Sequence, residues 1–181
     1  MDERIVYFEK PGRENTAEVL KLVKERAKAR GIRRIVLAST RGDTARAAAE
    51  AFAGTGLQIV AVPWQFHLRD EQQRFPQELV ASLQAQGHRV HFGTMLFHTG
   101  ELYGVQTPTV MANLLRTFCQ GAKVCIEIIM MATDGGCLEP GEKVIAVAGS
   151  GGGADTAFVA TAAPSTKLGV LRIHEIICKP M

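Results

Sequence analysis

The sequence has little that is typical of a secreted, disulfide-rich or nucleic-acid-binding protein. Its 181 residues include four cysteines, one tryptophan and two tyrosines, and the formal net charge is only +3. Cys119, Cys125, Cys137 and Cys178 show no CxxC spacing, so we expect reduced and mostly buried thiols. No basic run is interleaved with aromatic residues, so we expect no nucleic-acid partner.

Long hydrophobic runs are also missing. The longest strongly apolar stretch, Val124–Ala132, carries Glu127 and is too short to span a bilayer, so we expect no membrane partner. Asp2–Arg4 leads into the chain without an apolar segment of signal-peptide length, so we expect a cytoplasmic location. The histidines between residues 88 and 98 have no cysteine at metal-ligand spacing, so no metal site is predicted.

Short apolar runs alternate with helical patterns along the chain. The length fits one domain, residues 1–181. Asn15 followed by Glu18 has the spacing of a capping box, and Gly31 is a natural stop for the helix that follows. The expected strands are 5–8, 35–38, 57–62, 89–92, 144–148, 158–162 and 173–178. Further helices are expected at 44–52, 76–86 and 107–120, with Thr107 as a cap, and long loops at 63–75 and 93–106.

The opening β-α-β-α-β alternation predicts a parallel sheet with helices packed on its faces. Lys123–Asp134 stays ambiguous by pattern, because Val124–Ile126 favours a strand whereas the length and the glycines after Asp134 favour a buried helix. The expected architecture is therefore α/β, with a mostly parallel central sheet.

The strongest functional signal is the turn that follows the buried strand Ile35–Ala38. Ser39, Thr40 and Thr44 offer hydroxyl groups, Arg41 offers a guanidinium group, and Gly42 allows a close approach of the backbone. The start of the next helix carries partial positive charge, so the turn predicts a site for a phosphate or carboxylate. Asp43 opposes a bound anion unless it faces a sugar hydroxyl, and it also suits a simple helix cap.

This turn resembles the phosphate loop of flavodoxin-type flavin proteins, with Arg41 in place of the usual third-position threonine. The resemblance implies flavin mononucleotide (FMN) as the first candidate ligand. The turn is not a Walker loop, because no Gly-Lys-Ser/Thr follows, and it has too few glycines for a dinucleotide fingerprint.

A second candidate is the loop made of Gly149, Ser150, Gly151, Gly152 and Gly153. Three consecutive glycines are conformationally costly, which indicates a backbone close to a ligand, although a plain connection remains an alternative.

Ligands of parallel sheets sit outside the carboxyl ends of the strands, so both loops are expected at one cleft. If the first strand is parallel to its neighbours, the loop Glu9–Thr16 joins them and adds Asn15 and Thr16.

Other side chains carry weaker signals. His67, His88, His91 and His98 lie in or beside the long loops, where each could act as a base, although surface or packing roles are commoner. Glu127 and Asp134 could have shifted pKa values, but facing solvent or pairing with lysine or arginine is commoner for such carboxylates. Trp64 and Phe66 either stack on a flat ring or cover the edge of the core.

Two blocks resemble the C-terminal domain of pyruvate kinases. They are 35–46, with the following strand 58–62, and 136–149. In that family an apolar strand enters a Ser/Thr-Gly loop that holds a sugar-phosphate effector in many members. The resemblance implies a three-layer sandwich and a helix at Lys123–Asp134. Asp43 departs from the family pattern, so the same effector is not assumed.

The whole chain is similar to small stand-alone proteins of archaea and bacteria classed as pyruvate-kinase C-terminal-domain-like. The opening 7–12, the turn 42–45, the segment 153–157 and the ending 175–178 carry this similarity. It places Ser39, Thr40, Arg41, Gly42 and Thr44 at the phosphate-loop positions. The kinase's catalytic groups lie in a barrel domain that this sequence does not contain, so we expect no pyruvate kinase activity.

Three functions fit these observations. The first is binding of a phosphorylated small molecule, with FMN foremost. The second is an enzyme, flavin-dependent or acting on a sugar phosphate, with a base from the region His88–His98. The third is a ligand-free protein that forms homo-oligomers, as the resembled domain does.

Overall fold

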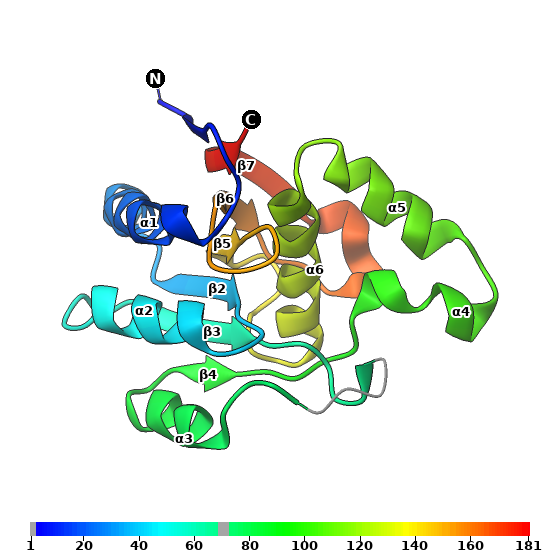
Figure 1. Cartoon of the computed structure of the whole chain (residues 1–181), viewed down its shortest axis with the longest axis horizontal. Helices are drawn as coiled ribbons and strands as arrows, with labels where there is room; N and C mark the ends of the chain where they lie inside the picture. The colour runs from blue at the N-terminus through cyan, green and yellow to red at the C-terminus, as the bar shows by residue number, and fades with distance from the viewer. Residues whose placement is uncertain (1–2, 69–72) are drawn as a thin grey trace.

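The computed structural model describes residues 3–68 and 73–181 and shows a sheet of seven strands between two layers of helices (Figure 1). The strands are β1 (Val6–Phe8), β2 (Arg34–Ala38), β3 (Gln58–Val62), β4 (Arg89–Val90), β5 (Lys143–Ala148), β6 (Thr156–Thr161) and β7 (Arg172–Pro180). The α-helices are α1 (Thr16–Arg30), α2 (Asp43–Ala51), α3 (Gln77–Ala85), α4 (Gly100–Tyr103), α5 (Thr107–Arg116) and α6 (Gln120–Asp134). Short 3₁₀ helices are η1 (Arg13–Asn15), η3 (Leu96–His98) and η4 (Ser165–Val170).

The sheet is mostly parallel, as predicted, with the strand order β1-β7-β6-β5-β2-β3-β4. Only β6 runs against its neighbours β5 and β7, whereas β1 pairs in parallel with β7 and β2 pairs in parallel with both β3 and β5. The strands β1, β2, β3 and β5 therefore all end at the same edge of the sheet. Because β1 runs parallel to β2 and β5, the loop after β1 lies at the same edge as the β2–α2 loop and the glycine loop.

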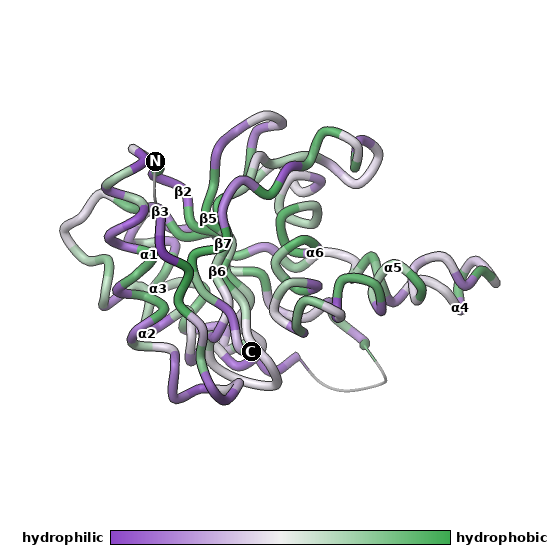
Figure 2. Tube along the Cα trace, turned by 90° about the horizontal axis from the view of Figure 1, so that it is seen from above, coloured by the Kyte–Doolittle hydropathy of each residue, from purple (hydrophilic) through white to green (hydrophobic). Residues whose placement is uncertain are grey.

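Each face of the sheet has its own hydrophobic core. Figure 2 shows α1, α2 and α3 on one side of the green central strands and α6 on the other, with α5 and α4 farther out. On β2, Ile35 and Leu37 belong to the first core and Val36 to the second, because successive strand residues face opposite ways. The central strands are buried on both faces, which explains their continuous apolar runs.

The segment Lys123–Asp134 lies in helix α6, as the resemblance implied. Most of α6 is buried, so apolar residues surround the helix and the one-sided helical pattern is lost from the sequence. Among the described residues, no helix combines the length and the apolar character needed to cross a membrane.

Several local expectations are wrong. Asn15 precedes α1, but its side-chain amide donates to the Lys10 and Gly12 carbonyl groups and closes the β1–α1 turn, so no capping box forms. Thr107 is the first residue of α5 and Gln106 takes the cap position. The predicted loop 93–106 contains η3 and α4. Residues 69–72 of the predicted loop 63–75 lie outside the described residues.

Candidate functional site

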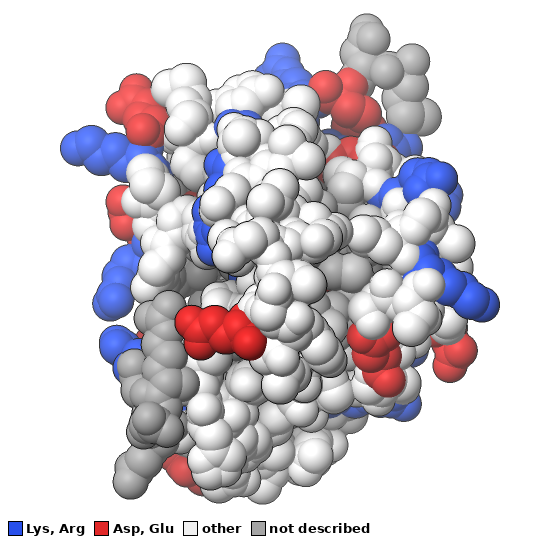
Figure 3. Space-filling model, turned by 90° about the vertical axis from the view of Figure 1, so that its right-hand side faces the viewer, with Lys and Arg blue, Asp and Glu red and all other residues white. Residues whose placement is uncertain are grey.

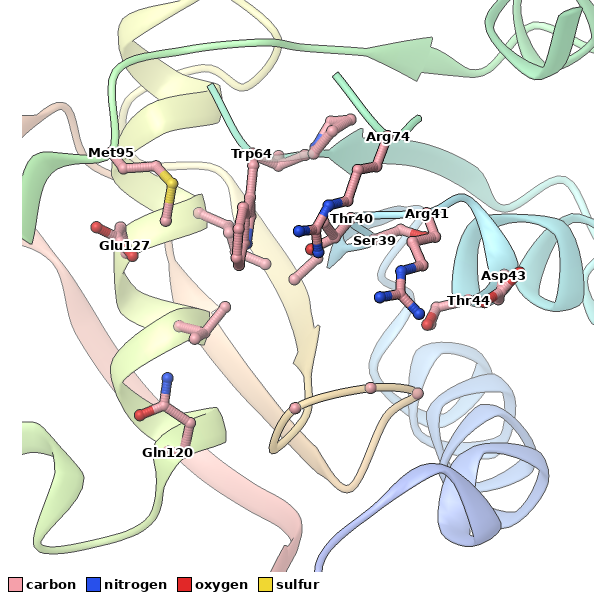
Figure 4. A pocket seen from close by; sticks show the side chains of 18 of the residues that line it. Ser39, Thr40, Arg41, Asp43, Thr44, Trp64, Arg74, Met95, Gln120 and Glu127 are labelled. Atoms are coloured by element: carbon pink, nitrogen blue, oxygen red, sulfur yellow. The ribbon is translucent and has the colours of Figure 1, made fainter. Parts of the chain in front are cut away.

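A cleft of about 650 Å³ opens at the carboxyl edge of the sheet. Figure 4 shows the β2–α2 loop on one side of this cleft, helix α6 on the other and the β5–β6 loop beneath. Chain segments far apart in the sequence contribute to its lining: the β1–α1 turn, the β2–α2 loop, the end of β3, η3, α6 and the glycine loop. The volume lies within the range of small-molecule sites.

The β2–α2 loop and the first turn of α2 contribute five of the six predicted residues to the lining: Ser39, Thr40, Arg41, Asp43 and Thr44. The hydroxyl group of Ser39 accepts a hydrogen bond from the Ala45 N–H (3.1 Å), so this serine caps α2. The N–H groups of Asp43 and Thr44 belong to the first turn, which has no intrahelical acceptors. The partial positive charge of α2 therefore lies at the cleft wall.

Gly42 does not line the cleft, contrary to its predicted contact with a ligand. It has φ +90°, and a Cβ atom there would lie 2.5 Å from Leu79 Cδ2. Gly42 is thus required for the turn and for the packing of α3, because an L side chain is strained at this φ value. A substitution of Gly42 would therefore change the stability of the fold before it changed ligand binding.

Within the glycine loop, only Gly151, Gly152 and Gly153 line the cleft. Gly149 lies behind them, where a Cβ would come within 2.5 Å of the Gly153 carbonyl oxygen. The Ser150 N–H donates to Asp155 Oδ2 (3.0 Å) and not into the cleft. The predicted ligand contacts of Gly149 and Ser150 are therefore not supported by their positions.

Asp155 holds two of the loops together. Its buried carboxylate accepts from the N–H groups of Gly12 (3.1 Å) and Ser150 (3.0 Å) and from the Thr156 hydroxyl (2.7 Å). The β1–α1 turn and the glycine loop are thus tied through one side chain. Sequence reasoning noted the segment 153–157 but assigned no role to Asp155.

The β1–α1 turn reaches the cleft through Arg13 and Thr16. The Thr16 hydroxyl donates to the Arg13 carbonyl (2.7 Å) and accepts from the Ala154 N–H (2.9 Å). A Cβ on Gly153, which has φ +69°, would lie 2.4 Å from Arg13 Cα, so glycine allows the two loops to touch. Asn15, the other predicted residue of this turn, does not line the cleft.

Among the described residues that line the cleft, basic side chains outnumber acidic ones. The basic residues are Arg13, Arg41, Arg74 and Lys123, and the acidic residues are Asp43 and Glu127. Figure 4 shows the guanidinium groups of Arg41 and Arg74 pointing into the space above the glycine loop. Arg74 also lies 5.4 Å from the centre of the Trp64 ring. In the part of the chain that the structure describes, the side of the cleft nearest α2 therefore carries Arg13 and Arg41 against the single carboxylate of Asp43.

Lys123 and Glu127 form a buried ion pair on α6, in which Lys123 Nζ donates to Glu127 Oε2. Glu127 Oε1 also accepts from the Phe97 N–H (2.9 Å) and lies 3.5 Å from His98 Nδ1. Burial by itself raises the pKa of Glu127, but the His98 hydrogen bond, Lys123 and the Phe97 N–H together leave it below its ordinary value. Burial lowers the pKa of Lys123, against the attraction of Glu127.

We compared the chain with known proteins. No protein-family model matches it. Pyruvate kinase from Cryptosporidium parvum, solved in complex with ADP, is similar in structure, with 18% sequence identity and a TM-score of 0.45. The match covers 85% of this chain and 25% of the kinase chain, so the chain spans about a quarter of that protein's length.

Among the candidate histidines, only His98 lines the cleft. His91 is packed between Gly93 and Gly135, where added Cβ atoms would lie within 2.5 Å of its ring. Burial lowers the pKa of His91, against the charge of Asp134, and burial also lowers the pKa of His88. His88 and His91 are therefore packed against other residues and do not line the cleft.

Sequence reasoning missed Lys123, Arg74 and Met95 as lining residues. For Lys123 a signal was available, because Lys and Glu four residues apart in an apolar helix favour a buried pair. The structure confirms the pairing of Glu127 with a basic residue, which is one of the alternatives that the sequence leaves open. Trp64, predicted to stack on a ring or to cover the core, lines the cleft. Among the described residues, no three His, Cys, Asp or Glu side chains are placed to hold a metal ion.

Proposed function

We propose that this chain binds a phosphorylated small molecule in the cleft, with FMN as the first ligand to test. The observation that carries this proposal is the presence of Arg13 and Arg41 around a cavity of about 650 Å³ that the start of α2 also lines. An anion there gains from the guanidinium groups and from the helix dipole together.

The phosphate group would lie against the β2–α2 loop. Arg41 and the Thr40 and Thr44 side chains come from this loop, and the Asp43 and Thr44 N–H groups belong to the first turn of α2. Ser39 supports the loop from within because its hydroxyl group is used to cap α2. Asp43 would need a hydroxyl group of the ligand as its partner, which a ribityl or sugar chain supplies.

A flat ring would lie deeper, between the end of β3 and α6. Trp64 and Met95 offer apolar surface there, and Gln120 offers an amide on α6 (Figure 4). Aromatic and thioether side chains pack well on a conjugated ring. An elongated ligand with a phosphate at one end and a ring at the other therefore matches both regions, and FMN has this form.

A second candidate function is catalysis, because His98 and Glu127 lie together in the same cleft. A histidine beside a carboxylate is suited to move a proton at neutral pH. In this case His98→Ala would abolish the turnover of a substrate found by screening sugar phosphates, whereas His91→Ala would leave it unchanged. Equal turnover by both variants would remove His98 from the mechanism.

The direct test of ligand binding is a thermal melt of the whole chain with FMN, riboflavin, fructose 1,6-bisphosphate or inorganic phosphate. A ligand at about a hundred times its dissociation constant stabilises the fold by roughly 2.7 kcal/mol, which raises Tm by roughly 5–10 °C at this size. We expect this shift with FMN and a much smaller one with riboflavin.

The other outcomes of the melt separate the parts of the proposal. A shift with fructose 1,6-bisphosphate alone would keep the phosphate site and contradict FMN. Equal shifts with FMN and riboflavin would show that the phosphate is not recognised. No shift with any of the four compounds would contradict the proposal and favour the ligand-free oligomer.

A further inference from the structure

Helix α6 brings a buried lysine to the wall of the cleft. Lys123 lines the cleft, although only 1% of its surface is exposed. An ammonium group has three N–H donors and no acceptor. A buried ion pair is favourable only when the remaining donors and acceptors also find partners. Each of the three donors of Lys123 therefore needs a partner.

The protein itself supplies one acceptor to Lys123. Among the described residues, Lys123 Nζ has one hydrogen-bond partner, Glu127 Oε2. The Phe97 ring, whose centre lies 5.3 Å from Nζ, covers another side of the ammonium group. At least one N–H donor of Lys123 is therefore left for an acceptor that the described part of the chain does not provide.

The surface outside α6 adds little negative charge near Lys123. Figure 3 shows the side of the molecule on which α5 lies over α6, and uncharged side chains occupy most of the middle of this view. Burial lowers the pKa of Lys123, the attraction of Glu127 opposes this shift, and the charge of Arg116 on α5 adds to it. A ligand that accepts hydrogen bonds would therefore be favoured beside Lys123.

One turn before Lys123, Gln120 offers a second donor. The carbonyl oxygen of its side chain accepts a hydrogen bond from Arg116 Nε (2.8 Å). Arginine only donates, so this contact fixes which side of the Gln120 amide faces Arg116. The amide NH₂ group is left for the cleft, and Figure 4 shows the Gln120 nitrogen, rather than its oxygen, turned toward the other lining side chains.

The carboxylate oxygens of this wall are already occupied by protein donors. Glu127 Oε2 accepts from Lys123, whereas Oε1 accepts from the Phe97 N–H (2.9 Å) and lies 3.5 Å from His98 Nδ1. A carboxylate only accepts, so Nδ1 carries the proton of a neutral His98 ring and Nε2 is left as an acceptor. The α6 wall thus offers two donors to a ligand and, through His98, one acceptor.

We propose that this wall recognises the edge of a cyclic amide or imide, in which a ring carbonyl lies beside a ring N–H. Lys123 and Gln120, which are neighbours three residues apart on α6, donate to the ring carbonyl oxygen, and His98 Nε2 accepts from the ring N–H. This inference rests on the proposed phosphate site across the cleft and names the class of ring at the other end of the same ligand. Flavin, hypoxanthine, guanine and uracil rings have such an edge, whereas adenine has an amino donor in place of the carbonyl.

The rest of the lining suits the flat faces of such a ring. Val124, Ile128 and Met131 come from α6 and line the cleft beside the polar groups. Trp64 and Met95 line it from other chain segments. Small-molecule sites combine apolar walls of this kind with a few polar groups that fix the orientation of the ligand.

The primary test compares two nucleotides that differ only at this edge. Inosine 5′-monophosphate (IMP) has a ring carbonyl and a ring N–H where adenosine 5′-monophosphate (AMP) has an amino group and an unprotonated ring nitrogen, and the ribose phosphate is the same. Isothermal titration calorimetry of the whole chain should give a Kd for IMP roughly tenfold to a hundredfold below that for AMP. Ribose 5-phosphate, which has no ring, measures binding at the phosphate end alone.

Two variants test the donors, and a third is their control. Gln120→Leu keeps the approximate size of the side chain and should narrow the difference between IMP and AMP several-fold. Lys123→Met/Glu127→Leu removes both buried charges together, so neither is left unpaired, and it should abolish most of the preference for IMP. The matched control, Glu18→Leu/Lys21→Met, removes an exposed ion pair (3.4 Å) from α1 and should keep the preference of the wild type. Circular dichroism and Tm confirm that the variants are folded.

Three results would overturn the proposal. They are a Kd for IMP no lower than that for AMP, a preference for IMP that survives both variants, and an equal loss of preference in the α1 control. If FMN or ribose 5-phosphate still binds in the first case, the phosphate site stands and only the class of ring is wrong. If FMN, ribose 5-phosphate and both nucleotides all fail to bind, the proposed phosphate site fails as well.

Discussion

The two walls of the cleft differ in how far their positive charges are compensated by carboxylates. On α6, Lys123 is buried and its charge is matched by Glu127, which two further donors also hold. Across the cleft, Arg41 is exposed and comes from a loop in which Asp43 is the nearby carboxylate. A compensated buried pair supports the structure, whereas a loosely compensated exposed charge is available for a ligand. The α6 wall therefore supports the fold, and the opposite wall carries the proposed anion site.

The largest effect should follow from breaking the α6 pair. Glu127→Ala leaves the Lys123 charge buried without its partner and removes the acceptor of the Phe97 N–H. We expect a loss of about 3–5 kcal/mol in the free energy of unfolding, measured by urea denaturation. The double variant Lys123→Met/Glu127→Leu serves as the control and should recover most of the loss, because it removes both charges. A single variant as stable as the double would contradict the structural role of the pair.

A smaller effect, on binding and not on stability, should follow from changing the opposite wall. Arg41→Gln should weaken FMN binding roughly tenfold to a hundredfold, because a charge-assisted hydrogen bond to the phosphate is lost. Tm without ligand should stay unchanged. Isothermal titration calorimetry measures the affinity, and Arg46→Gln, one turn along α2 and outside the cleft lining, is the matched control. Equal losses in both variants would show that only the general charge of this region matters.

The smallest effect should appear in acid. The pKa of Glu127 in the folded protein lies below its ordinary value, which is about 4.3 in an unfolded chain. The unfolded state therefore binds the proton more readily, and the stabilisation by the Glu127 carboxylate is complete above that value and is lost as the pH falls through the folded pKa. Glu175 adds to this loss: burial opposes the shift, but Arg30 and Arg26 hold its pKa below the ordinary value.

The measurement is Tm from about pH 7 to about pH 3. Glu127→Gln should show a shallower fall of Tm with acid than the wild type, because one contributing carboxylate is gone. Glu175→Gln should keep the part of the acid-induced fall in Tm that depends on Glu127. An identical acid profile for the wild type and Glu127→Gln would contradict the assignment.

The sequence was sufficient to predict the central strands and the two loops that follow β2 and β5. Ile35–Ala38 and Val144–Ala148 are continuous apolar runs followed by turn residues, so both their burial and the loops at their ends are local signals. The direction of β1 followed from no local signal, because it depends on pairing with β7 at the other end of the chain.

The parts that the sequence did not predict depend on contacts between distant residues. Gly42 appeared to face a ligand, and only the position of Leu79 on α3 shows that the glycine serves packing. Arg74 enters the cleft beside Trp64 after a long loop whose path no local pattern specifies.

The hydrogen bond from the Gly12 N–H to Asp155 has a consequence for the order in which the cleft forms. The two residues are 143 positions apart. During synthesis, the β1–α1 turn waits for its carboxylate partner until most of the chain has emerged, and contacts of such long range form slowly. Arg13 and Arg41 are therefore synthesised early, but the contact between the β1–α1 turn and the glycine loop, which shapes the cleft around them, forms late. A nascent chain that ends before β6 has the charges of the cleft without its shape, so ligand capture would mark a fully folded molecule.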